Sequence, residues 1–125
     1  MKKILIVEDD PDILDLIETI LRQEGYAVIK INRPVPIKEV IGIKPDLVIL
    51  DYLLPYGLGS DLCLEIKTNP VTRTIPVLLF SASLSLAEIA SISRADDFIA
   101  KPFDLDQFLS LVSRWINKKE KNDEE

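Results

Sequence analysis

The sequence predicts an α/β domain with a flavodoxin-like, doubly wound and parallel five-stranded sheet in the strand order 2-1-3-4-5. Short apolar runs that end in polar residues alternate with amphipathic helical patterns along most of the chain. The run at residues 47–50 is apolar throughout, which is typical of a strand covered by helices on both faces. The 125 residues, 47% of them hydrophobic, are enough for one domain with a buried core.

The first strand is predicted over residues 4–7, where an apolar run stops at the acidic triplet 8–10. A helix follows at once, because Asp10 is a suitable N-cap and Pro11 suits the first helical position. Apolar residues then recur at helical spacing until Gly25 ends the pattern. The inner face of this helix is assigned to Ile13, Leu16, Ile17, Ile20 and Leu21.

The middle of the chain contains a second strand, a short helix and the central strand. Residues 26–31 are β-branched and mostly apolar, which predicts the second strand. Pro34 and Pro36 prevent an early helix and leave about two turns, over residues 37–42. The buried strand at residues 47–50 then runs directly into Asp51.

The rest of the domain repeats the alternation of helix and strand. The predicted elements are a helix from Ser60 or Asp61 to about Lys67, a strand over 77–80 ending at Ser81, a short helix from Ser83 or Ser85 through Ile92, a strand over 97–100, and a final helix capped by Asp104. Residues 1–117 form the domain, and the charged tail 118–125 is expected to be disordered.

Composition excludes several classes of function. The chain has no His, which removes His-based acid–base catalysis and the usual transition-metal sites. The single Cys63 fits a reducing compartment. A net charge of -6, without a basic block before the tail, argues against direct binding to nucleic acid or anionic lipid. No run is long enough to span a membrane, so we expect a cytoplasmic protein whose partners are proteins or cations.

Polar residues follow the strands at the edge where ligands bind in such sheets. Glu8 and Asp9 follow the first strand, and Asp51 follows the third. If the strand order reverses between these two strands, the three carboxylates meet, and a pair about 5 Å apart repels by roughly 3 kcal/mol at an effective dielectric of 20. Such a site requires a cation, and oxygen ligands favour Mg²⁺ or a similar hard ion.

A hydroxyl and an ammonium complete this predicted site. Ser81 follows the fourth strand and Lys101 the fifth, and both groups suit a bound phosphoryl group. Asp51 is then placed as a nucleophile for phosphorus, because carboxylates form aspartyl-phosphate intermediates. Each residue also has a plainer interpretation, as a helix-capping acid, a strand-end hydroxyl or a solvated charge.

These separated motifs resemble those of the receiver domains of two-component response regulators, of the stand-alone, CheY-like type, over residues 2–117. The resemblance implies that Asp51 accepts a phosphoryl group from a histidine kinase or phosphotransfer protein with Mg²⁺ or Mn²⁺ bound, and that a downstream protein reads the result. It also implies that the carbonyl of Leu53 ligates the metal and that the Lys101-Pro102 bond is cis. Phe98 would be the aromatic switch residue that responds to Ser81. No enzymatic turnover of another substrate is expected.

The chain departs from the family pattern in its fourth helix. The interval from Ser81 to Lys101 is shorter than usual, and Arg94 stands where a helix-ending glycine is common. We therefore expect this helix to be short or irregular. In the family, that helix, the last strand and the final helix form the face that reports phosphorylation.

Three alternatives stay open at this stage. The first is a degenerate receiver that binds a partner constitutively, although the motif residues are intact. The second is a flavodoxin-like nucleotide or flavin carrier, which is disfavoured because the acidic loop at residues 8–10 repels phosphate unless a metal intervenes. The third is an aspartate-based phosphohydrolase, which would carry its nucleophile after the first strand.

Overall fold

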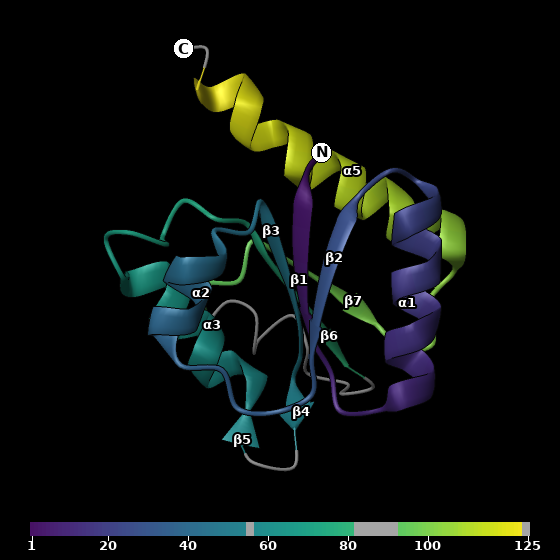
Figure 1. The fold of residues 1–125 in the computed structure, drawn as a ribbon, viewed down its shortest axis with the longest axis horizontal. Coiled ribbons are helices and arrows are strands. Elements are labelled where there is room, and N and C mark those ends of the chain that lie inside the picture. Colours follow the sequence, from purple (N-terminus) through teal and green to yellow (C-terminus); the bar gives the residue numbers. More distant parts are fainter. Residues whose placement is uncertain (55–56, 82–92, 124–125) are drawn as a thin grey trace.

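A single five-stranded parallel sheet forms the centre of the molecule (Figure 1). The computed structural model describes residues 1–54, 57–81 and 93–123. The strands of the sheet, in chain order, are β1 (Lys3–Val7), β2 (Ala27–Ile31), β3 (Leu47–Asp51), β6 (Val77–Ser81) and β7 (Asp97–Ala100). Their spatial order is β2-β1-β3-β6-β7, which confirms the predicted 2-1-3-4-5 arrangement and places the reversal between β1 and β3.

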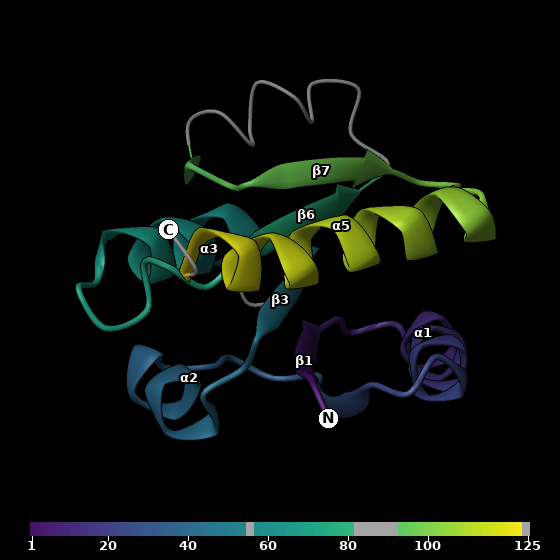
Figure 2. The same cartoon turned by 90° about the horizontal axis from the view of Figure 1, so that it is seen from above.

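Helices cover both faces of the sheet (Figures 1 and 2). They are α1 (Pro11–Gln23), α2 (Ile37–Ile43), α3 (Gly59–Thr68) and α5 (Leu105–Asp123). One hydrophobic cluster joins the sheet to α1 and α5, and a second joins it to α2 and α3. Residues 4–7 of β1 and 47–50 of β3 are all apolar because their side chains alternate between the two clusters, so both faces of these strands are buried.

The strand ends that carry the candidate site are in register. Asp51 pairs with Phe80, and Ser81 pairs with Ala100, along neighbouring parallel strands. On the other side of β3, Val7 pairs with Leu50. The residues that follow β1, β3, β6 and β7 therefore come to one edge of the sheet, as the sequence predicts.

The start and end of α1 agree with the prediction, but one assignment to its inner face is wrong. The Asp10 carboxylate accepts hydrogen bonds from the backbone N–H groups of Asp12 and Ile13, and Gly25 follows the helix with a φ of 90°. Leu14 is buried in the core, whereas Leu16 is 57% exposed. The sequence pattern misled us because apolar residues occur on more than one face of this helix.

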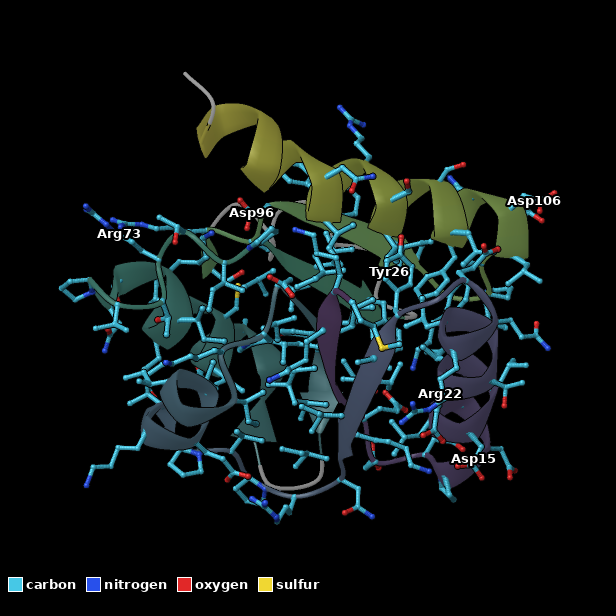
Figure 3. All side chains as sticks on the ribbon, turned by 45° about the horizontal axis from the view of Figure 1, so that its top comes forward. Asp15, Arg22, Tyr26, Arg73, Asp96 and Asp106 are labelled. Carbon is cyan, nitrogen blue, oxygen red and sulfur yellow. The ribbon has the colours of Figure 1, made fainter. Side chains whose placement is uncertain are left out.

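An ion-pair network joins β2, the edge strand of the sheet, to α1. The ammonium of Lys30 lies 3.1 Å from Asp15 and 2.9 Å from Glu18, both on α1. Arg22 pairs with Glu18 and donates from Nη2 to the Val28 carbonyl at 3.0 Å (Figure 3 labels Asp15 and Arg22). Charged side chains of this kind discourage the pairing of a further strand with an exposed edge.

The second half of the domain contains two elements that the sequence did not predict. A short antiparallel pair, β4 (Leu53–Leu54) and β5 (Gly57–Leu58), follows the central strand where only a loop was expected. The helix after it begins at Gly59 and not at Ser60 or Asp61. Cys63 is buried in this helix, and burial raises the pKa of its thiol to about 11, which fits a core residue.

The final helix starts where predicted and ends later. Asp104 accepts a hydrogen bond from the backbone N–H of Gln107. The helix extends to Asp123, whereas the disorder expected for residues 118–125 stays a prediction. Lysine and glutamate at residues 118–121 are good helix formers, which accounts for the longer helix.

Three further findings bear on the predictions. The fourth helix expected over residues 83–92 lies outside the described residues. Arg94, just after them, has a φ of 63°, so the position where the sequence lacks a glycine does adopt the left-handed conformation. In the part of the chain that the structure describes, no helix is long and apolar enough to cross a membrane.

Candidate functional site

Three carboxylates meet at the point where the strand order reverses. Glu8 and Asp9 follow β1 and Asp51 ends β3, and one oxygen from each lies within 4.8 Å of the others. Glu8 is 1% exposed and Asp51 is 6% exposed, whereas Asp9 is open to solvent. The predicted convergence of these three side chains is therefore found in the structure.

Glu8 is a buried acid whose carboxylate is only partly hydrogen-bonded. One carboxylate oxygen, Oε1, accepts a hydrogen bond from the backbone N–H of Asp10 at 3.3 Å. The other, Oε2, is buried and has no hydrogen-bond partner among the described residues. Burial raises the pKa of Glu8 to about 8, and the neighbouring Asp51 carboxylate raises it further, because a second negative charge close by disfavours ionisation.

Lys101 supplies the positive charge of the site. Its ammonium lies 3.4 Å from Oδ2 of Asp51 and 3.7 Å from Oε2 of Glu8, and the Lys101-Pro102 peptide bond is cis, as predicted. Both distances are longer than the roughly 2.8 Å of a strong charge-assisted hydrogen bond. The side chain is 20% exposed, so one cation faces two largely buried acids at the rim of the site.

Gly59 supports the acceptor strand in a way that the sequence reading missed. Its backbone N–H donates to the Tyr52 carbonyl at 2.7 Å. A side chain at this position would collide with the backbone carbonyl of Asp51, so only glycine permits this approach of α3 to the strand. Two glycines shortly after Asp51, at positions 57 and 59, are the sequence signal that could have found this contact.

The structure gives the positions of the remaining predicted site residues, Ser81, Leu53 and Phe98, but does not test their roles. Ser81 ends β6 at the same edge as Asp51, and Leu53 begins β4 two positions after Asp51. Phe98 lies in β7 and is 40% exposed. Metal ligation by the Leu53 carbonyl and the switching roles of Ser81 and Phe98 stay predictions.

The donor set fits a hard divalent cation. Every candidate ligand is an oxygen, the acids are held close together, and Oε2 of Glu8 is a buried acceptor that no described protein group satisfies. Mg²⁺ and Mn²⁺ prefer carboxylate, carbonyl and water oxygens. The cluster could therefore bind such an ion, which would offset the repulsion between the acids.

Fold and site together define a class of protein: a doubly wound α/β domain with a cluster of acids at the switch point of its sheet that could hold a cation. The family model for the response regulator receiver domain matches residues 4–113. The chain thus belongs to the receiver domains of two-component response regulators, the domains through which phosphorylation controls signalling in these systems.

Relatives of known sequence support this assignment. The chain is 32% identical over 121 residues to the DNA-binding dual master transcriptional regulator RpaA of Synechocystis, an alignment that includes 94% of this chain and 50% of that protein. It is 32% identical to the response regulator ArlR of Staphylococcus saprophyticus, over 94% of this chain and 54% of the relative. The chain spans about half the length of the curated relatives that it matches.

Solved structures show the same fold. The receiver domain of a sensor histidine kinase from Pseudomonas aeruginosa, with magnesium in its active-site cleft, superposes with a TM-score of 0.83 at 27% identity, covering 93% of this chain and 98% of that one. The response regulator TrrA of Thermotoga maritima, in complex with Mg²⁺ and beryllofluoride, gives a TM-score of 0.81 at 29% identity, with coverage of 92% and 99%.

Proposed function

We propose that this receiver domain is switched by transfer of a phosphoryl group to Asp51 from a histidine kinase or phosphotransfer protein. One observation carries the proposal: the Asp51 carboxylate lies at the switch point between two further acids and the ammonium of Lys101, which is 3.4 Å away. Buried ionisable groups that cluster in this way are typical of functional sites, because a residue with only a structural role rarely has so many charged neighbours.

In the proposed transfer, a carboxylate oxygen of Asp51 forms a bond to phosphorus while the P–N bond of the donor phosphohistidine breaks. The imidazole keeps the electron pair of that bond and takes up a proton. The ammonium of Lys101, already close to Asp51, would pair with the phosphoryl oxygens, and the hydroxyl of Ser81 would donate a hydrogen bond to one of them. The domain is thus a phosphoacceptor and not an enzyme for other substrates.

The carboxylates of Glu8, Asp9 and Asp51, with the backbone carbonyl of Leu53, would hold Mg²⁺ or Mn²⁺. The support is the oxygen-only donor set and the unsatisfied Oε2 of Glu8. A bound ion would neutralise the charge that develops on the phosphoryl oxygens. Glu8 and Asp9 would then act only as ligands, whereas Asp51 would be both a ligand and the nucleophile.

The output is proposed to be a change in protein binding. Phe98 on β7 is 40% exposed and would report the state of Ser81 to a downstream protein. Direct contact of this domain with nucleic acid is not proposed, because its net charge is -6. A cytoplasmic location stays a prediction from the sequence.

Acetyl phosphate with Mg²⁺ tests this proposal. We expect the intact mass of the wild-type protein to rise by about 80 Da, the mass of one phosphoryl group. Asp51→Asn removes the acceptor and should abolish the adduct, whereas Asp61→Asn, at an exposed position in the first turn of α3, should keep it. Absence of the adduct on wild type, or its persistence on Asp51→Asn, would reject the proposed role of Asp51.

A further inference from the structure

An aromatic ring lies beside the site lysine and has no part in the chemistry described so far. The ammonium of Lys101 is 4.6 Å from the centroid of the Phe80 ring. Phe80 is completely buried, and it pairs with Asp51 in the register of β3 and β6. The same residue therefore adjoins both the strand that presents the acceptor and the cation that faces it.

The Phe80 ring helps to hold the ammonium of Lys101, which the two carboxylates contact only at long distances. Lys101 stands 3.4 Å from Asp51 and 3.7 Å from Glu8, too far for its position to be set by short hydrogen bonds alone. The face of an aromatic ring attracts an ammonium group within about 6 Å of its centroid. This attraction acts beside the 3.4 Å hydrogen bond from the ammonium to Oδ2 of Asp51, which uses one of its three N–H donors.

The aromatic residue Phe103 sets the plane of the Phe80 ring. Phe103 meets Phe80 edge to face, with centroids 6.3 Å apart and planes at 84°. Phe103 in turn stacks on Phe108 of α5 at 5.1 Å. Edge-to-face and offset-stacked pairs are favoured arrangements, so the ring under Lys101 has a defined orientation.

We propose that Phe80 is a positioning residue whose ring face holds the ammonium of Lys101 within reach of Asp51. This inference rests on the proposed role of Lys101 in phosphoryl transfer. The competing interpretation is that Phe80 only fills the core between the sheet and α5, as its membership of that cluster also requires. The two interpretations differ in what happens to Lys101 when the ring is changed.

The first test observes Lys101 directly, with no phosphodonor present. We expect the ring to shift the NMR signals of the Lys101 ε-methylene protons upfield, with the signals assigned by Lys101→Arg. Phe80→Leu should abolish this shift. Phe108→Leu is the matched control, since it makes the same substitution at a buried position of the same cluster and keeps both the Phe80 ring and its edge-to-face partner Phe103. Unshifted signals in wild type, or equal shifts in wild type and Phe80→Leu, would overturn the inference.

The second test keeps the shape of the core. Fluorinated phenylalanines introduced at position 80 weaken the electrostatic attraction of the ring with little change in its size. The rate of adduct formation with acetyl phosphate should fall with each added fluorine, reaching about 3- to 10-fold for the trifluoro ring, in line with known cation–π interactions. The same series at Phe108 should leave the rate unchanged. Equal rates along the series at position 80 would reject the positioning role.

The two tests separate this inference from the function on which it rests. A wild-type protein that forms no adduct would refute phosphorylation of Asp51, yet the NMR shift would still report whether Phe80 holds Lys101. An adduct on wild type, with no effect of fluorination, would refute only the role of Phe80.

Discussion

Replacing Glu8 by glutamine should change how the stability of the metal-free protein depends on pH. Glutamine has nearly the same shape but cannot be charged. In the wild-type protein, burial first and the neighbouring Asp51 second raise the pKa of Glu8 from 4.5 to about 8. The unfolded chain exposes Glu8 to water, where its pKa returns to the ordinary value.

The sign and size of the effect follow from these two pKa values. At pH values between 4.5 and about 8, Glu8 keeps its proton in the folded state and has lost it in the unfolded state. The stabilisation that this proton gives is complete below pH 4.5 and disappears as the pH rises through about 8. At about 1.36 kcal/mol for each unit, the wild type should lose about 2 to 3 kcal/mol relative to Glu8→Gln between pH 5.5 and pH 8.

Urea unfolding in EDTA at pH 5.5, 7 and 8 measures this difference. The free energies of unfolding of wild type and Glu8→Gln should diverge as the pH rises, with the variant gaining. Glu65→Gln, at an exposed position of α3, is the control and should follow the wild type at every pH. Parallel curves for wild type and Glu8→Gln would show that burial and Asp51 do not raise the pKa of Glu8. The reasoning about the acidic cluster would then fail.

Three further predictions concern the site and its supports. Mg²⁺ at 100 times its dissociation constant should stabilise the wild type by about 2.7 kcal/mol and Glu8→Gln by clearly less, as measured by urea unfolding; equal gains would exclude Glu8 as a ligand. Gly59→Ala should lower the free energy of unfolding by more than about 2 kcal/mol, since its Cβ meets the Asp51 carbonyl, while Gly42→Ala, with open space around it in α2, should raise it by up to about 1 kcal/mol. Arg94→Gly should raise the melting temperature, because a φ of 63° costs a non-glycine residue about 1 kcal/mol; an unchanged melting temperature would contradict this.

The sequence predicts the features that depend on the succession of strands and helices and on the residues at the strand ends. Buried strands and helices alternate clearly, so a parallel sheet between two layers of helices follows from general rules of topology, whereas the strand order came with the family resemblance. The sequence predicts that Glu8, Asp9 and Asp51 lie close together, because they stand at the carboxyl ends of parallel strands. The structure confirms that they do. The cis bond at Lys101-Pro102 came from the family resemblance and is also found.

The features that the sequence did not predict depend on how the helices and strands pack against one another. The contact of Lys101 with the Phe80 ring requires the register of β6 with β3 and the path of the chain after β7. The close approach of Gly59 to Asp51 requires the position of α3 on the sheet. In both cases the residue types alone are compatible with several arrangements, and only packing selects one.

The central claim is that Glu8, Asp9 and Asp51 bind one divalent cation beside a site for a phosphoryl group that Lys101 completes. Titration with beryllofluoride, a phosphoryl analogue, followed by ¹⁹F NMR with and without Mg²⁺, tests it most directly. We expect a bound fluoride signal that requires Mg²⁺ and is lost in Asp51→Asn. A bound signal that persists without a divalent cation or without the Asp51 carboxylate, or no bound signal in the wild type, would contradict the claim.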